Sequence, residues 1–114
     1  MPRCDEDLTL FVYGSLIDEG RRLELLGRPV TTAPATLRDY VLGRARYFYI
    51  IRQPDAVTAG LLLLDLSARD FVELDRYEEI PILYTREKIE VADAAGQPQR
   101  CWVYLPTPRI LSGD

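Results

Sequence analysis

The sequence predicts a small α+β fold, a mixed or antiparallel β-barrel with one or two helices packed against it. Three observations support this fold class: β-rich runs follow one another without regular helical alternation, one segment carries strong helix signals, and turn residues separate the runs. A length of 114 residues is typical of one globular domain. We therefore expect a single domain over residues 1–114, with its core at about 8–105.

The first predicted elements are a strand, a tight turn and a short helix. Residues 8–13 are rich in β-formers and stop at Gly14-Ser15, which indicates a strand followed by a turn. Residues 21–26 carry two leucines three positions apart, and Gly27 follows as a stop signal. A helix is expected there.

Three further strands are expected in the middle of the chain. Residues 35–42 and 46–51 contain β-formers separated by Gly43, and the second run closes at Gln53-Pro54-Asp55. Residues 57–66 are almost continuously apolar, which is typical of a strand covered on both faces. Gly60 within this run indicates a bulge, or a place where another backbone or a ligand comes close.

The strongest helix signal begins at Ser67. Ser67 and Asp70, three positions later, form a capping box, so a helix is predicted from about Ala68 to about Glu78, ending before Pro81. Strands are predicted at 84–91 and 100–105, joined by a glycine-containing hairpin loop at 94–97. Regular structure is expected to end at 106–108, where two prolines occur.

Charge and hydropathy exclude several classes of function. The chain has 18 acidic and 14 basic residues, a net charge of −4 and a pI near 4.8, so nucleic acid is not expected as a partner. Its apolar runs are far shorter than the roughly 20 residues that a bilayer requires, and its N-terminus is too acidic for a signal peptide. A soluble cytoplasmic protein without membrane partners is expected.

The absence of histidine excludes Ser-His and Cys-His nucleophiles and histidine-rich metal sites. Acid-base chemistry must then use Asp, Glu, Tyr, Lys or Cys. Cys4 and Cys101 lack the CxxC spacing of zinc or redox sites. Cys101 alternates with Val103 and Leu105 in a predicted strand, so we interpret it as a small buried apolar residue.

Glu78 is the candidate proton-transfer residue, because helical periodicity turns it inward. At about 100° per residue Glu78 falls within the apolar stripe, whereas Glu73 and Arg76 fall toward the polar side. A carboxylate that loses hydration has a raised pKa and exchanges protons near neutral pH. Two structural interpretations stay open here: Glu78 lies at a frayed helix end, or it pairs with an arginine such as Arg86.

The turn at Gly14 is the second candidate element. A glycine turn after a strand exposes several N–H groups on one side, which suits a carboxylate or a developing oxyanion. The turn lacks the GxxxxGK[ST] pattern of a phosphate loop, so a nucleotide is not expected. Seven tyrosines are more than so short a chain needs for its core, and we expect roughly two or three of them to reach a ligand.

These motifs occur together in an order that resembles the γ-glutamylcyclotransferase-like (AIG2-like) family. The resemblance covers most of the chain, from about residue 8 to 105, and implies a small mixed β-barrel with attached helices and a cavity at one end beside the turn. The motifs that carry it are Tyr13-Gly14-Ser15-Leu16, Gly60, Leu74-Asp75-Arg76-Tyr77-Glu78 followed by Pro81, Leu83-Tyr84-Thr85-Arg86, and Val103-Tyr104.

The resemblance also implies roles for individual residues. Glu78 takes the place of the family's catalytic glutamate, and Tyr84 resembles the tyrosine that lines the family cavity. The substrate-binding loop corresponds to Tyr13, Gly14, Ser15 and Leu16. The family commonly has glycine after the glutamate, whereas this chain has Glu79, a second carboxylate that would repel an anionic substrate or point to solvent. No cofactor or metal is expected.

The implied activity converts a γ-glutamyl amine or peptide into 5-oxoproline and a free amine. The substrate's own α-amine attacks the side-chain carbonyl, so no Ser or Cys nucleophile is required, and holding the folded conformer supplies much of the acceleration. Glu78 would deprotonate the α-ammonium and then protonate the leaving amine. The expected partner is a small γ-glutamyl substrate.

Two other classes of function remain. The same cavity would serve a non-catalytic module that binds a small amino-acid-like ligand, and a structural or interaction protein is the third possibility, although no residue specifically supports it. Within the enzymatic interpretation, the leaving amine is expected to be selected by residues 53–58 and 80–83. The sequence predicts no oligomeric state.

Overall fold

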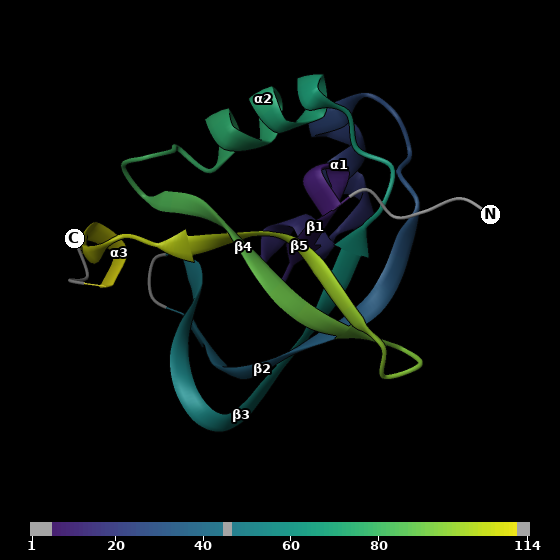
Figure 1. The fold of residues 1–114 in the computed structure, drawn as a ribbon. Helices are drawn as coiled ribbons and strands as arrows, with labels where there is room; N and C mark the ends of the chain where they lie inside the picture. Colours follow the sequence, from purple (N-terminus) through teal and green to yellow (C-terminus); the bar gives the residue numbers. More distant parts are fainter. Residues whose placement is uncertain (1–5, 45–46, 112–114) are drawn as a thin grey trace.

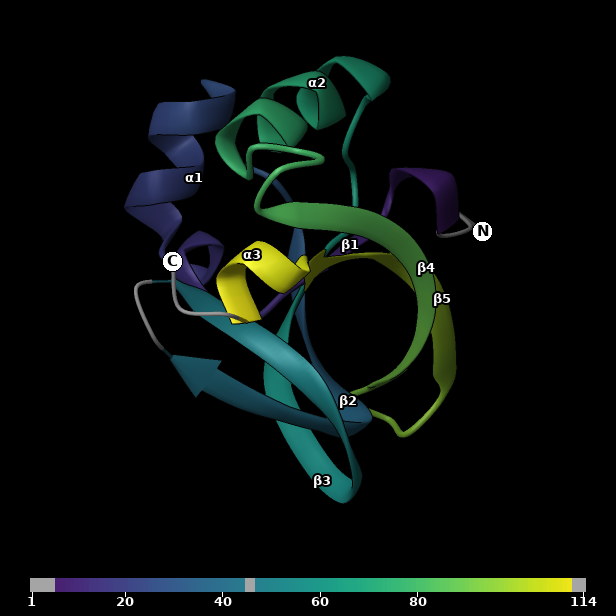
Figure 2. The same ribbon diagram turned by 90° about the vertical axis from the view of Figure 1, so that its left-hand side faces the viewer.

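The computed structural model describes residues 6–44 and 47–111. Five strands close into a barrel in the order β1, β3, β2, β4, β5, and α1 and α2 lie together on one side of it (Figures 1 and 2). The predicted α+β barrel with packed helices is confirmed. In chain order the elements are η1 (Glu6–Leu8), β1 (Leu10–Val12), η2 (Ser15–Ile17), α1 (Glu19–Leu26), β2 (Thr32–Arg44), β3 (Phe48–Leu63), α2 (Ala68–Tyr77), β4 (Tyr84–Asp93), β5 (Pro98–Pro106) and α3 (Pro108–Leu111).

The barrel is mixed because β1 pairs antiparallel with β3 but parallel with β5. Gly60 of β3 lies against β1, and a Cβ atom at this position would meet Val12 O at 2.3 Å and the Phe11 ring at 2.7 Å. The predicted close approach of another backbone to Gly60 is therefore confirmed. This contact holds the end of β1, and the turn that follows it, close against β3.

The predicted strand break at 53–55 is wrong, whereas the break predicted at Gly43 lies slightly too early in the chain. β2 runs to Arg44 and β3 begins at Phe48, but β3 continues through Gln53-Pro54-Asp55, so the two strands form one long antiparallel ribbon. The ladder shifts beside Asp39, which has φ +67°, as does Asp55, and the Asp55 N–H donates to Asp39 Oδ1 over 3.0 Å. The turn-forming residues are accommodated in this bulge and do not end the strand.

Other strand limits differ by a few residues. The predicted first strand is shorter, because Glu6–Leu8 form a three-ten turn, and β3 ends at Leu63, three residues before the predicted end. The prediction of a strand covered on both faces is wrong for Val57, which is 60% exposed, so only the later part of that run, with Leu62 and Leu63, belongs to the core. The predicted strand start at Arg46 lies outside the described residues.

The helices follow their local signals. The predicted capping box at α2 is present: Ser67 Oγ accepts from the Asp70 N–H over 3.1 Å, and Asp70 Oδ2 accepts from the Ser67 N–H over 2.9 Å. α1 ends at Gly27, which adopts φ +75° as its predicted stop signal requires. The short α3, however, lies where regular structure was expected to end, since proline fits the first position of a helix.

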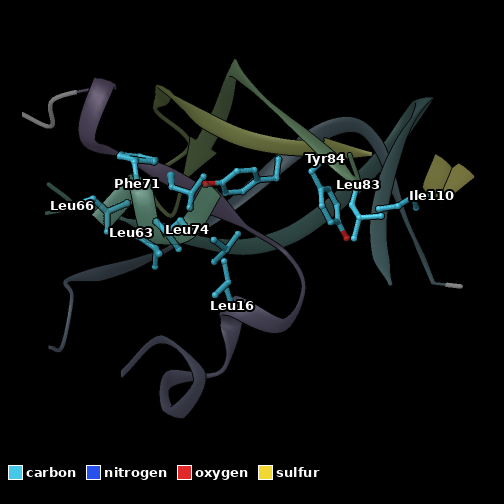
Figure 3. Packing of buried hydrophobic residues seen from close by; sticks show 11 residues of the cluster. Leu16, Leu63, Leu66, Phe71, Leu74, Leu83, Tyr84 and Ile110 are labelled. Atoms are coloured by element: carbon cyan, nitrogen blue, oxygen red, sulfur yellow. The ribbon is translucent and has the colours of Figure 1, made fainter. Parts of the chain in front are cut away.

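Two groups of apolar side chains form the core. The first lies largely between α2 and the barrel, where Leu63, Leu66, Phe71 and Leu74 gather, while Tyr84 lies on the side toward α3 (Figure 3). The second fills the barrel with residues from all five strands: Phe11, Tyr13, Ala35, Leu37, Ile50, Leu62, Val91, Cys101 and Val103. Cys101 is fully buried, as predicted, and burial raises the pKa of its thiol to about 12.

Candidate active site

A cavity of about 340 Å³ opens where the end of α2 meets the barrel. Its walls come from the end of β1 and the following turn, the region around the start of β3, the end of α2, the start of β4 and the end of β5. This volume suits a small molecule. The lining is largely aromatic and consists of Phe11, Val12, Tyr13, Gly14, Ser15, Leu16, Tyr47, Phe48, Tyr77, Glu78, Glu79, Leu83, Tyr84 and Tyr104.

The turn after β1 forms one wall. Gly14 O accepts from the Ile17 N–H over 3.1 Å and Ser15 O accepts from the Asp18 N–H over 3.2 Å, which forms the short three-ten helix η2. The first N–H groups of such a turn have no partner within it, and no acceptor for the Ser15 or Leu16 N–H occurs among the described residues. A Cβ on Gly14 would lie 3.0 Å from Phe48 Cβ, so β3 packs closely behind the turn.

Arg22 holds this turn from behind. Its guanidinium is buried and donates to Leu16 O over 2.9 Å and to Ile17 O over 2.7 Å. The side chain of Arg22 therefore satisfies carbonyls at the end of the turn and fixes its position relative to α1. The sequence offered no signal for this role, because an arginine in a short polar helix is expected to be solvated.

Glu78 lies at the C-terminal end of α2. It is the residue after the last helical position, and its backbone is still helical, with φ −82°; its N–H donates to Leu74 O over 2.9 Å, so the helical direction persists to this residue. The side chain is half-buried and lines the cavity. Burial raises the pKa of the Glu78 carboxyl to about 7, the direction that its inward position predicted.

The alternative pairing of Glu78 with Arg86 is wrong. Arg86 Nε lies 3.1 Å from Asp75 Oδ1, and the guanidinium lies over the rings of Phe71 and Trp102, each 4.5 Å from the ring centroid. Among the described residues the Glu78 carboxylate has no hydrogen bond or ion pair. The arginine is therefore engaged elsewhere, and the negative charge of Glu78 is not neutralised by it.

Three of the lining tyrosines donate their hydroxyl protons to the protein itself. Tyr13 OH donates to Tyr104 O, Tyr84 OH donates to Phe48 O, and Tyr104 OH donates to Asp75 Oδ1 over 2.7 Å. Burial raises the pKa of all three phenols, so they remain protonated at neutral pH. These three hydroxyls therefore join the cavity walls to one another. The number of tyrosines in the sequence, in contrast, predicts that two or three of them reach a ligand.

A fourth tyrosine connects the turn to α2. Tyr77 OH lies 2.8 Å from Ser15 Oγ, and Arg21 Nη1 approaches the same hydroxyl at 3.5 Å. The sequence pattern indicates no role for Tyr77, although it directly precedes Glu78 and projects from the same helix end. The pair joins the two predicted site elements, the turn and the end of α2, across the cavity.

The structure thus brings every predicted site residue to one place. Tyr13, Gly14, Ser15, Leu16, Glu78 and Tyr84 all line the same cavity. Of the two segments expected to select the leaving amine, 80–83 contributes Leu83, but 53–58 lies within β3 and contributes no lining residue. In the described part of the chain no group of three or more His, Cys, Asp or Glu side chains is arranged to hold a metal ion.

Comparison with known proteins agrees with this architecture. Residues 10–114 match the family model described as gamma-glutamyl cyclotransferase, AIG2-like. The chain belongs to this family. No described helix is both long enough and apolar enough to cross a membrane.

One curated relative is a Methanocaldococcus jannaschii protein named gamma-glutamylcyclotransferase and putative RNase, which is 28% identical over 103 residues. The match covers 84% of this chain but 45% of that protein, so the chain spans less than half the length of this relative.

Solved structures share the fold at lower identity. A solution structure from Arabidopsis thaliana has a TM-score of 0.80 at 20% identity, covering 91% of this chain and 71% of that one. A structure titled gamma-glutamyl cyclotransferase has a TM-score of 0.78 at 20% identity, covering 88% and 66%. An AIG2-like protein from Mus musculus has a TM-score of 0.62 at 19% identity, covering 96% and 86%.

Proposed function

We propose that this protein is a γ-glutamylcyclotransferase-type enzyme that converts a γ-glutamyl amine or peptide into 5-oxoproline and a free amine. The observation that supports this most directly is the position of Glu78, a half-buried carboxylate whose pKa is raised to about 7, in one cavity with the turn at 14–16. A group with that pKa accepts and returns protons at neutral pH. Membership of the family supports the same reaction class.

In the proposed reaction Glu78 serves in two successive proton transfers. As a base it removes a proton from the substrate α-ammonium, and the freed amine attacks the γ-carbonyl carbon and closes the five-membered lactam. As an acid it returns that proton to the nitrogen of the breaking amide bond. The attacking nitrogen still carries one proton more than the lactam keeps, and the re-ionised carboxylate takes this second proton and passes it to the departing amine, which is released as an ammonium ion. Both protons lost by the α-nitrogen thus reach the leaving nitrogen, and one carboxylate can transfer them in turn.

The turn would supply the electrostatic part of the reaction. The N–H groups of Ser15 and Leu16 have no acceptor among the described residues, and they are suited to bind the substrate carboxylate or the developing oxyanion. Tyr84 and the other aromatic residues would form the wall that keeps the substrate folded, with its α-amine beside its own carbonyl. The side chains Ser15 and Tyr77, which contact each other at 2.8 Å, hold turn and helix together.

The test is to incubate the protein with γ-glutamyl amines, γ-glutamyl-ε-lysine and γ-glutamyl dipeptides and to follow 5-oxoproline by mass spectrometry. Glu78→Gln should lower kcat by about a hundredfold or more, as expected for a lost general base. Glu90→Gln is a matched control, because it removes one exposed carboxylate outside the cavity lining.

Two results would contradict the proposal. Equal turnover by wild type and Glu78→Gln would remove Glu78 from the mechanism. If no substrate yields 5-oxoproline but γ-glutamyl compounds still raise the melting temperature, the cavity belongs to a non-catalytic ligand-binding module.

A further inference from the structure

Glu79 occupies a backbone conformation that residues with a side chain rarely adopt. Its φ is +53°, in the left-handed region that is free of steric cost only for glycine. The turn around it is held by the main chain: the Glu79 N–H donates to Arg76 O over 3.1 Å, and Glu79 O accepts from the N–H groups of Ile82 and Leu83 over 2.8 and 3.0 Å. The direction of its side chain is therefore set by the turn.

The side chain of Glu79 lies at the rim of the cavity. It is exposed and belongs to the lining, one position beyond the half-buried Glu78. Among the described residues its carboxylate has no hydrogen bond or ion pair, and Arg21, which contacts Tyr77 at 3.5 Å, forms no bridge to it. A charged side chain kept in an unfavourable backbone conformation, without a described protein partner, points to a role toward a ligand.

Glu79 and Glu78 set the charge of the cavity. Within the described lining these two are the charged side chains, and the other lining residues are aromatic, aliphatic, glycine or serine. A cleft with low-dielectric walls focuses the field of such charges and raises the local concentration of cations. Aromatic walls also favour a positive group. The rim is therefore attractive to an ammonium group and repulsive to a carboxylate.

We infer that Glu79 is a specificity-determining residue. It favours γ-glutamyl amides whose leaving amine carries an ammonium group in addition to the α-ammonium of the glutamyl part, and it disfavours those whose leaving amine carries a carboxylate. This inference rests on the proposed function, because the α-amine of the substrate must lie at Glu78. The glutamyl portion then fills the inner part of the cavity beside the turn. The leaving amine extends toward the rim, where it meets the charge of Glu79.

A series of γ-glutamyl amides with leaving amines of similar length tests this inference. The probes carry 1,4-diaminobutane (cationic), n-pentylamine (neutral) and 4-aminobutanoate (anionic). For wild type we expect kcat/KM to decrease in that order. Glu79→Gln should lower kcat/KM for the cationic probe, because an attraction is lost, and raise it for the anionic probe, because a repulsion is lost. Each change should be about five- to tenfold for two charges across a partly solvated rim. The neutral probe should change less than about twofold.

Matched controls separate charge from backbone conformation. Glu79→Gly removes the charge and also relieves the left-handed backbone, so it should produce the same change of preference as Glu79→Gln. Glu90→Gln changes the net charge equally but lies outside the cavity lining, and it should leave the order of the probes as in wild type. Raising the salt to about 0.5 M should narrow the wild-type preference, because exposed charges are screened.

The outcomes distinguish this inference from the proposed function. Turnover that depends on Glu78 but shows the same charge preference in Glu79→Gln as in wild type would overturn the inference and leave the proposed function intact. The same probes are also titrated calorimetrically into Glu78→Gln, where affinity reports the charge preference without turnover. If neither kcat/KM nor affinity depends on the charge of the leaving amine, the inference is contradicted. If Glu78→Gln prefers the cationic probe in affinity and the double variant Glu78→Gln/Glu79→Gln does not, the inference is supported.

Discussion

The two ends of α2 carry carboxylates in opposite states. Asp70, in the first turn, is buried, and burial alone would raise its pKa. Hydrogen bonds from the Ser67 N–H and from the Arg28 guanidinium outweigh burial and hold the pKa of Asp70 below its usual value. Glu78, at the other end, has no such donors among the described residues, and burial raises its pKa to about 7.

This difference shows that burial alone does not determine what an acid does. With donors arranged around it, Asp70 is locked in its ionised form and stabilises the start of the helix. Without donors, Glu78 exchanges its proton near neutral pH. The helix therefore combines a structural acid and a proton-exchanging acid eight positions apart.

The largest expected effect concerns the pH dependence of the proposed reaction. Glu78 must be ionised to act as the base, so kcat/KM should fall below pH 7 by nearly tenfold per pH unit, roughly fiftyfold to a hundredfold between pH 7 and 5. Initial rates of 5-oxoproline formation across this range measure the profile. Asp70→Asn should keep the inflection, and an inflection near pH 4.5 in wild type would show that Glu78 is not the titrating base.

The next effect is on stability at the other end of the helix. Asp70→Asn removes the negative charge that pairs with Arg28 and that accepts from the Ser67 N–H in the capping box. We expect the free energy of unfolding at pH 7, measured in urea, to decrease by about 1–3 kcal/mol. Because the folded pKa of Asp70 is lowered, its contribution is present above the unfolded value, near 3.8, and is lost as the pH falls through the folded pKa. Equal stability of variant and wild type at pH 7 would contradict this account.

Glu78→Gln should have the opposite sign in the same measurement. The folded pKa, about 7, lies above the unfolded value of 4.5, so ionising Glu78 makes the folded state less stable as the pH rises through that window. The variant lacks this penalty, and we expect it to be about 3 kcal/mol more stable than wild type at pH 8. The two should be equal at pH 4, and a constant difference would contradict the shifted pKa.

The smallest effect isolates the capping box. Ser67→Ala removes the hydroxyl that accepts from the Asp70 N–H and leaves the Arg28–Asp70 pair in place, so about 1 kcal/mol of stability should be lost. Thermal unfolding of Ser67→Ala, Asp70→Asn and the double variant measures how far the two changes are coupled. A Ser67→Ala loss as large as that of Asp70→Asn would mean that the salt bridge contributes nothing.

The features that the sequence predicts well are those whose causes lie within a few residues. The capping box of α2 and the glycine that ends α1 are both local, and the inward position of Glu78 follows from the helical period. The close approach at Gly60 was also predictable, because a glycine within an apolar strand often marks a place where another backbone packs against it.

The features that were missed depend on contacts between distant segments. Residues 53–55 carry turn signals, yet they lie in a bulge opposite Asp39, because pairing with β2 along the whole ribbon outweighs local propensity. Arg22 is buried because the turn after β1 folds over it. The sequence leaves Glu78 as a possible partner of Arg86, whereas the observed partner is Asp75, because the two acids lie one helical turn apart and only the packing decides between them.

The close contact at Gly60 has a consequence for any mutational survey of this protein. Even an added methyl group there would press on the carbonyl of Val12 and on the ring of Phe11, two residues that line the cavity. Substitution would displace the strand that leads into the turn at 14–16 and abolish the proposed activity, although Gly60 has no chemical role in it. A screen scored by activity alone would rank Gly60 beside Glu78, and a parallel measurement of folded protein is what tells the architectural position from the reactive one.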